Sequence, residues 1–303
     1  MESVQPADGL FPWPRALPPS YARSVTGLRT LDRAVGLGPG DHASWAYDDV
    51  SELRSACLDY FSDGLTRSER LVYVGGRPRN ALLDDLMRLP GRDTLLADGR
   101  LSVHTLIGHL ESPGDLAPRV QLEARRAAAQ DAVAAGYAGL RVAGDITELV
   151  RRPYLVDPLV EFELAVDAAM STTTVTTLCA LDRQETGERW RLVSALHAIQ
   201  HSPGRPPSFA LRRSGSAVTL VGEIDIACVQ DLDGLLDHLL RTTTGAVTFE
   251  LPDLEFIDVA GTRRLAVFQR AMAAAGRTVL FRRLSPAARR TFRAFALVDA
   301  NDL

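Results

Sequence analysis

Two short stretches of this sequence have residue types at spacings that could support chemistry. His197 and His201, in the predicted helix "RLVSALHAIQH", are four residues apart, and on a helix both imidazoles would lie on one face as metal ligands do. The stretch lacks the glutamate of an HExxH motif, and His201 precedes the helix-breaking "SPG", so we predict no metal site. The second stretch, "GGRPRN" at 75–80, follows an apolar run where a nucleotide-binding protein has its phosphate-binding loop.

Composition limits what that loop could do. All 34 basic residues of the 303-residue chain are arginine, so it has neither a P-loop lysine nor a Schiff-base lysine. Gly75, Gly76, Arg77 and Arg79 could hold an anion at a helix N-terminus, but a glycine turn with solvated arginines is the simpler interpretation. No nucleophile–base pair or carboxylate dyad is evident, and we predict that the chain is not an enzyme.

The overall totals argue against several classes of protein. The net charge of −4 and a pI near 5.9 argue against general nucleic-acid binding. No apolar run approaches the ~20 residues that a membrane span needs. Three widely spaced cysteines give neither a disulfide framework nor a zinc-ligand spacing, so we expect a cytoplasmic protein.

Proline and glycine divide the chain into its expected parts. The stretch "HSPGRPPS" predicts a linker at 201–208, and the proline-rich start predicts a disordered tail at 1–28. At 29–200, short apolar runs alternate with helical patterns, which predicts a mostly parallel sheet covered by helices. At 209–303, three strands alternate with three helices, which predicts a small α/β domain. The strands expected before the linker are 71–76, 101–106, 139–144 and 175–181.

The stretches "LVGEID", "TFELPDLEFIDVAG" and "LSPAARRTFRAFAL" occur in the last part of the chain in the order and spacing of a known family. By these stretches, residues 209–303 resemble a STAS domain of the anti-sigma factor antagonist type. In that family, a serine directly after the aspartate that ends a strand is phosphorylated by a partner anti-sigma kinase. The added charge disrupts docking at the helix N-terminus.

The resemblance also implies which residues of this chain contact the partner. Val259 stands at the serine position and cannot accept phosphate, and the family gives Thr262 no such role. We therefore expect a domain that keeps its docking turn and has lost its own phosphoswitch. The implied partner-binding residues are Asp225, Asp258, Val259, Ala260, Gly261 and Thr262.

A second resemblance covers the front of the chain. The stretches "GDHASWAYDD", "LTRSERLVYVGG", "AAGYAGLRVAGDIT", "LVEFELAVDAAM" and "LHAIQH" follow one another in the order of the methanogen/methylotroph sensory (MEDS) domain. The resemblance implies a RecA-like or KaiC-like α/β fold that senses small molecules without nucleotide-hydrolysing machinery. It implies no particular cofactor, so the cofactor stays unknown.

Polar residues within these motifs are the candidates for a small-molecule or redox site. A lone buried histidine or cysteine is more often a core residue. A binding site is favoured over a core role because several of these residues are expected at the ends of adjacent parallel strands, where pockets form. The candidate ligand-binding residues are His42, Glu163, Cys179, Asp182 and His197.

Together these patterns predict a bacterial signalling protein with a sensory domain and a STAS output domain. We expect the sensory domain to control partner binding by packing on the surface around 258–262. The expected partner is an anti-sigma factor of the ATP-binding kinase type, without direct contact to nucleic acid or membrane. The alternative is a non-phosphorylatable STAS scaffold whose turn contacts other STAS proteins in a larger regulatory assembly.

Overall fold

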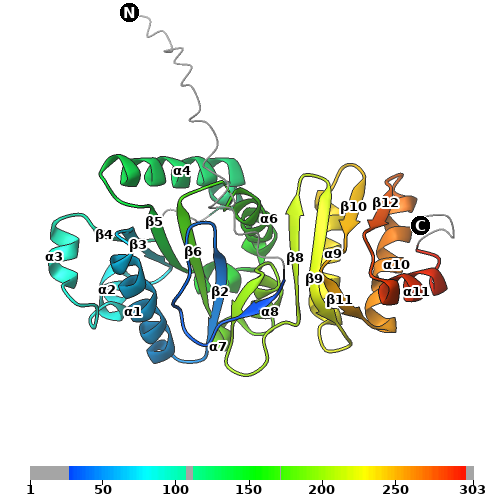
Figure 1. The fold of residues 1–303 in the computed structure, drawn as a ribbon, viewed down its shortest axis with the longest axis horizontal. Helices are drawn as coiled ribbons and strands as arrows, with labels where there is room; N and C mark the ends of the chain where they lie inside the picture. Colours follow the sequence, from blue (N-terminus) through cyan, green and yellow to red (C-terminus); the bar gives the residue numbers. More distant parts are fainter. Residues whose placement is uncertain (1–26, 107–111, 171, 298–303) are drawn as a thin grey trace, which may run out of the picture.

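Helix α6 (Pro153–Met170) lies near the centre of the molecule, between two α/β lobes that are side by side (Figure 1). The computed structural model describes residues 27–106, 112–170 and 172–297. The predicted tail, 1–28, falls outside the described residues except for its last two positions. The sheet of the first lobe and strand β8 (Phe209–Ser214) of the second lobe both contact α6.

The first lobe is built on a seven-stranded sheet in the order β1-β7-β2-β6-β5-β3-β4, and its strand pairs are parallel. This confirms the predicted α/β fold, and each of the four expected strands begins and ends within one residue of an observed strand. The strands are β1 (Arg29–Thr30), β2 (His42–Tyr47), β3 (Arg70–Gly75), β4 (Leu101–Thr105), β5 (Leu140–Asp145), β6 (Val175–Asp182) and β7 (Ile199–His201).

The predicted helix "RLVSALHAIQH" is wrong in its second half. Helix α8 ends at Ser194, and β7 follows and pairs with β1 and β2. The short strand β7 is stabilised by partners distant in the sequence, and this tertiary pairing overrides the local helical spacing. His201, the first residue of the predicted linker, is therefore the last residue of a strand in the first sheet.

Helices cover both faces of the first sheet. Leu71 and Tyr73 of β3 point to the face covered by α1, α2 and α3, whereas Val72 points to the face covered by α4, α5, α6 and α8. By the same alternation, His42 and Cys179 lie on the α6 face. The helices of this lobe are α1 (Val50–Thr66), α2 (Arg79–Asp85), α3 (Arg92–Ala97), the 3-10 helix η2 (Pro113–Leu116), α4 (Pro118–Ala134), α5 (Thr147–Arg151), α6, α7 (Arg183–Thr186) and α8 (Arg189–Ser194).

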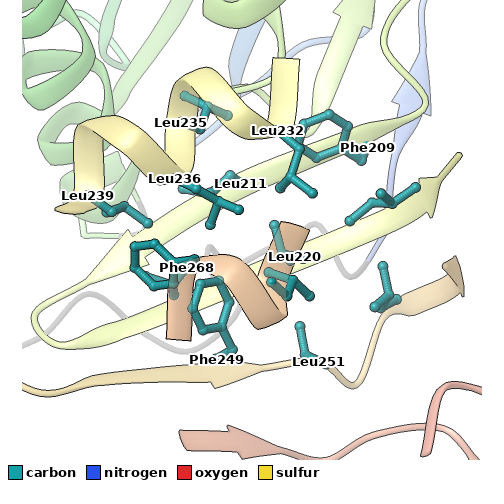
Figure 2. Close-up of a cluster of buried hydrophobic side chains, with 14 of the residues drawn as sticks. Phe209, Leu211, Leu220, Leu232, Leu235, Leu236, Leu239, Phe249, Leu251 and Phe268 are labelled. Atoms are coloured by element: carbon teal, nitrogen blue, oxygen red, sulfur yellow. The ribbon is translucent and has the colours of Figure 1, made fainter. Parts of the chain in front are cut away.

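The second lobe has a smaller sheet in the order β11-β9-β10-β12, with β8 antiparallel to β9. Leucines of α9 and Phe268 of α10 pack against this sheet, and the Phe268 and Phe249 rings meet edge to face (Figure 2). This confirms the small α/β domain, although neither β8 nor β11 was among the three strands expected from the sequence. Its other elements are β9 (Ala217–Ile224), α9 (Val229–Thr242), β10 (Val247–Glu250), β11 (Leu254–Ile257), α10 (Val259–Ala274), β12 (Val279–Arg282) and α11 (Pro286–Ala294).

The two lobes share a hydrophobic core. Val160 and Leu164 of α6, and Leu196 after α8, are buried in the same cluster as Leu211 of β8 and Leu235 of α9. The second lobe therefore depends on side chains of the first lobe to complete its interior. Two domains that merely shared a flexible linker would not be joined in this way.

Candidate functional site

Four of the five candidate ligand-binding residues converge at one buried point on the α6 face of the first sheet. His42 is the first residue of β2, and Cys179 lies in the middle of the neighbouring strand β6. Glu163 comes from α6, and His197 follows α8. Each of the four side chains thus comes from a different element, and strand pairing and core packing fix its position.

The donor atoms of this four-residue cluster lie close together. His42 Nε2 lies 3.0 Å from Glu163 Oε2 and 3.1 Å from His197 Nε2. Cys179 Sγ lies 3.5 Å from His42 Nε2 and 3.6 Å from Glu163 Oε2. His197 Nε2 lies 3.6 Å from Glu163 Oε2, and all four donor atoms are within 4.8 Å of one another.

Burial dominates the electrostatics of the cluster. Burial, and then the neighbouring His197, lower the pKa of His42, which favours the neutral imidazole. Burial opposes ionisation of Glu163, but the interactions with the neighbouring His197 and His42 side chains outweigh it and hold the pKa of the carboxyl well below its usual range. Burial, together with the charge of Glu163, raises the pKa of the Cys179 thiol well above its usual value. The cluster therefore combines a carboxylate with a neutral imidazole and a protonated thiol.

A cavity of about 230 Å³ reaches the cluster at Glu163 and Cys179. Its walls are mainly apolar side chains of the sheet and of α4, α5 and α6, with Gln121, Arg125 and Thr177 as further polar members. Arg125 lies over the Phe162 ring, 5.1 Å from its centroid. These cavity-lining residues of α4 were not among the predicted site residues, because a polar residue on an amphipathic helix has no local signal that it faces a pocket.

Asp182 does not join the cluster. It ends β6, and its carboxylate accepts hydrogen bonds from two backbone N–H groups of α7, at 2.8 and 3.0 Å. His201 stacks instead on the Trp45 ring, with centroids 3.6 Å apart. The expectation that the site lies at the ends of adjacent strands is wrong, because His42 begins its strand and Cys179 is central. The cluster forms because α6 crosses the face of the sheet.

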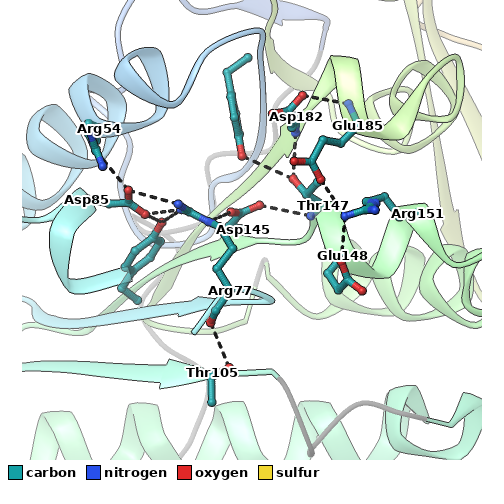
Figure 3. Close-up of polar contacts among 12 residues, drawn as sticks. Arg54, Arg77, Asp85, Thr105, Asp145, Thr147, Glu148, Arg151, Asp182 and Glu185 are labelled. Atoms are coloured by element: carbon teal, nitrogen blue, oxygen red, sulfur yellow. Dashed lines mark hydrogen bonds and ion pairs between the residues drawn. The ribbon is translucent and has the colours of Figure 1, made fainter. Parts of the chain in front are cut away.

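The loop "GGRPRN" is occupied by ion pairs of the protein itself. The Arg77 guanidinium pairs with Asp85 and lies 3.2 Å from Asp145, while the Tyr73 hydroxyl donates to Asp85 at 2.9 Å (Figure 3). Both aspartates are buried. A phosphate at this loop would have to displace two carboxylates from Arg77. Arg79 is exposed, as expected for a glycine turn with solvated arginines.

The predicted docking turn lies at the N-terminus of α10. The Asp258 carboxylate is the N-cap and accepts from the Gly261 N–H at 2.7 Å. A Cβ on Gly261 would lie 2.5 Å from Ile224 Cγ2, so close packing explains this glycine. Thr262 is fully buried, and its hydroxyl donates to the Asp258 carbonyl at 2.8 Å. Val259 in contrast is 63% exposed.

The surface around Val259 is apolar with a basic rim. Ile226, 73% exposed, and Val267, 45% exposed, line one hollow with Val259, Arg263 and Arg264. Ile226, Arg263, Arg264 and Val267 were not among the predicted contact residues. The spacing of four between Val259, Arg263 and Val267 on one helix was the signal that could have found them.

Charged residues also join α6 to the second lobe. His238 of α9 is buried, with Nδ1 3.0 Å from Asp157 and Nε2 2.7 Å from Glu161. Burial opposes ionisation of Glu161, but hydrogen bonds from His238 and Arg213 lower its pKa to about 2.

The first lobe thus packs on β8 and α9. The expectation that it packs on the surface around 258–262 is wrong, since Val259 stays exposed.

Ala260, another predicted contact residue, lines the same hollow. Asp225 is the last of the predicted contact residues. Its Oδ2 is 3.3 Å from Arg205 of the predicted linker. The linker therefore touches a residue that immediately precedes Ile226 in the hollow.

Comparison with known proteins identifies both parts of the chain. Residues 41–197 match the family described as MEDS, the MEthanogen/methylotroph, DcmR Sensory domain, and residues 208–300 match the family described as Mlab, STAS domain. No protein with a curated function matches the chain. A solved structure of the anti-sigma factor antagonist SpoIIAA in its unphosphorylated form is similar to 29% of this chain and 81% of its own, with 22% identity and a TM-score of 0.26.

These matches confirm both resemblances found in the sequence. None of the described helices combines the length and the apolar character required to cross a bilayer. A sensory domain followed by a STAS domain indicates a role in signalling. The chain belongs to the MEDS family and carries a STAS domain after its sensory domain.

Proposed function

We propose that this chain is a cytoplasmic bacterial signalling protein whose MEDS domain senses a small molecule and controls an anti-sigma factor antagonist-like STAS domain. The STAS domain binds an anti-sigma factor of the ATP-binding kinase type. The exposed apolar hollow around Val259 carries the proposal, because exposed apolar patches with polar rims mark protein-binding sites. Val259 has no hydroxyl, so a kinase docked there cannot end the interaction by phosphorylating that position.

The cavity beside Glu163 and Cys179 supports the sensory part of the proposal. Its apolar walls favour a small apolar molecule, and an apolar cavity of only about 150 Å³ already holds benzene. The two polar side chains from α4 would orient one polar group of such a molecule. Binding there would act directly on α6, which supplies one wall of the cavity and Glu163.

Helix α6 provides the first route from this cavity to the STAS domain. Glu161 and Glu163 are two residues apart and so lie about 200° apart around the helix axis. Glu163 faces the sensory cluster, whereas Glu161 pairs with His238 of α9. A shift or rotation of α6 would therefore change both contacts at once.

Helix α8 provides a second route. His197 follows α8, whose Arg191 pairs with Asp231 of α9 at 2.9 Å. Leu192 of α8 packs so closely that a Cβ on Gly234 of α9 would lie 2.5 Å from its Cδ1. Because α9 begins beside the hollow, we infer that the signal repositions α9 rather than covering the turn.

Nucleotide hydrolysis is no part of the proposed function. The chain has no lysine, and in the loop at the position of a phosphate-binding loop Arg77 is engaged by two buried aspartates. These carboxylates would repel a phosphate and deprive it of the arginine.

The proposal is tested by titrating purified anti-sigma factors of the kinase type, from the same bacterium, into the full-length chain by calorimetry. Val259→Asp should weaken binding at least about tenfold, because docking would bury an unpaired carboxylate next to Asp258. Leu280→Asp is the matched control, since Leu280 is an exposed residue of β12 outside the hollow. If no such factor binds, or if Val259→Asp binds as tightly as the control, the proposal fails.

The second candidate, a STAS scaffold, uses the same hollow to contact other STAS domains. Size-exclusion chromatography with light scattering separates the two functions. A large homotypic assembly that Val259→Asp dissolves and Leu280→Asp leaves intact would favour the scaffold.

A further inference from the structure

We infer that His42, Glu163, Cys179 and His197 form a four-coordinate transition-metal site whose donors best suit Zn²⁺. The inference names a ligand class for the sensory site proposed above and rests on that proposal for its role in signalling. The presence of the site itself rests on geometry and donor chemistry. It also differs from the histidine pair that the sequence suggested, because only His197 of that pair contributes.

The spacing of the donor atoms fits a tetrahedral ion. Zinc bonds of about 2.0–2.1 Å to nitrogen or oxygen and about 2.3 Å to sulfur place neighbouring donors roughly 3.3–3.6 Å apart. Five of the six distances among the four donor atoms run from 3.0 to 3.6 Å, and the sixth, between Cys179 Sγ and His197 Nε2, is within 4.8 Å. An ion at their centre would therefore need adjustments of a few tenths of an ångström at these five distances, with Cys179 and His197 drawn together by the ion.

Proton accounting also favours a cation. A carbonyl oxygen only accepts, so His197 Nδ1 carries the proton that it donates to the Val193 carbonyl at 3.0 Å. In the neutral ring, Nε2 is then a bare lone pair, and it faces His42 Nε2 and the Glu163 carboxylate. One N–H of His42 and one S–H cannot satisfy all the contacts among four lone-pair-bearing atoms. A metal ion would satisfy every one of them.

The bond to Val193 is the support that metal-bound histidines ordinarily have. Donation from the second ring nitrogen to a backbone carbonyl fixes the tautomer and leaves Nε2 free to coordinate. His42 Nδ1, by comparison, is buried and has no hydrogen-bond partner within the described part of the chain. The two imidazoles are therefore not equally supported, and His197 is the better-oriented ligand.

The donor types select among metals. A thiolate with two imidazoles favours zinc or a similar transition ion over the oxygen-seeking Mg²⁺ and Ca²⁺. Binding would convert the Cys179 S–H to a metal-bound thiolate and release its proton to solvent. The two positive charges of the ion then balance one thiolate and one carboxylate, so the buried site has no net charge. The adjoining cavity would place a small molecule directly beside the ion.

The test is metal loading of the full-length chain after stripping with a chelator. We expect one equivalent of Zn²⁺ or Co²⁺ per chain by elemental analysis, and a sulfur-to-cobalt charge-transfer band with the visible spectrum of tetrahedral Co²⁺. Cys179→Ser should abolish that band, and the near-isosteric Glu163→Gln should weaken Zn²⁺ binding by more than about 100-fold. Cys57→Ser is the control, since Cys57 is buried on α1 at the opposite face of the sheet.

Thermal unfolding distinguishes the loss of the metal site from a folding defect in a variant. Zn²⁺ should raise the melting temperature of the wild type and of Cys57→Ser, and leave that of Cys179→Ser unchanged. Failure of the wild type to take up stoichiometric metal, or a charge-transfer band that persists in Cys179→Ser, would overturn the inference. Anti-sigma factor binding is measured separately on the metal-loaded and the metal-stripped chain. A chain that binds metal but no partner would count against the proposed function and not against the metal site.

Discussion

Leu164 tests how the two lobes are joined. This side chain of α6 is 1% exposed and belongs to the hydrophobic cluster that fills the STAS domain. Leu164→Ala would therefore open a cavity at the boundary between the domains. Leu159→Ala is the matched control, because Leu159 is fully buried on the same helix but packs in a cluster of the MEDS domain.

The expected loss of stability follows from burial. Truncation of a fully buried leucine costs about 2–5 kcal/mol, because the transfer free energy is lost and a cavity remains. At ~1.4 kcal/mol per tenfold change, the unfolded fraction rises roughly 30-fold to several thousand-fold. With a urea m-value of roughly 2–3 kcal/mol/M, the unfolding midpoint falls by about 0.7–2.5 M. Both variants should fall in this range, since the two sites are equally buried.

Hydrogen exchange of the full-length chain then separates the two variants. In Leu164→Ala, the amides of β8 and α9 should exchange faster along with those of α6, because these elements share the damaged cluster. In Leu159→Ala, the faster exchange should stay within the MEDS domain. If β8 and α9 keep wild-type protection in Leu164→Ala while global stability falls, α6 does not couple the domains and the proposed signal route is wrong.

Two further predictions concern the docking turn and the domain interface. Incubation with an anti-sigma kinase should leave residues 255–265 without phosphate. Val259 has no hydroxyl, and the Thr262 hydroxyl is buried and donates to a carbonyl. A phosphorylated peptide from this stretch in mass spectrometry would contradict the prediction. The pKa of Glu161 is lowered in the folded state from 4.5 to about 2, so its stabilising contribution is complete above pH 4.5 and is lost as the pH falls toward 2. The free energy of unfolding should therefore decline less steeply across that window in Glu161→Gln than in the wild type, and parallel urea-melting profiles would refute the assignment.

Local sequence pattern predicted four strands of the first sheet but missed the six-residue β2 and the shorter β1 and β7. β7 has three residues, and its stability comes from β1 and β2, so no local signal distinguishes it from the end of a helix. Helix α6 did carry an unused signal. The stretch "PYLVDPLVEFELAVDAAM" is apolar around most of its circumference, which indicates a helix buried on more than one side. This is the position that α6 has between the two lobes.

The sequence predicted which residues form the candidate site better than it predicted where the site lies or what it could bind. The motifs selected His42, Glu163, Cys179 and His197 correctly as neighbours, yet Asp182 belongs to a helix cap. A search for metal ligands by spacing considers one element at a time. These four side chains come from four elements, so only the crossing of α6 over the sheet reveals their contact.

The shared core also decides which experiment can reveal regulation. Deleting the MEDS domain would remove Val160 and Leu164 from the STAS interior and both carboxylates from His238. The remaining fragment would expose an apolar face on β8 and α9, and new binding by that fragment would report the exposed face rather than release of the docking turn. Point variants on α6 avoid this artefact because they keep the face covered. Glu161→Gln, which leaves the shape of the interface intact, should therefore change anti-sigma factor affinity if α6 relays the signal, and an unchanged affinity would exclude this contact from the route.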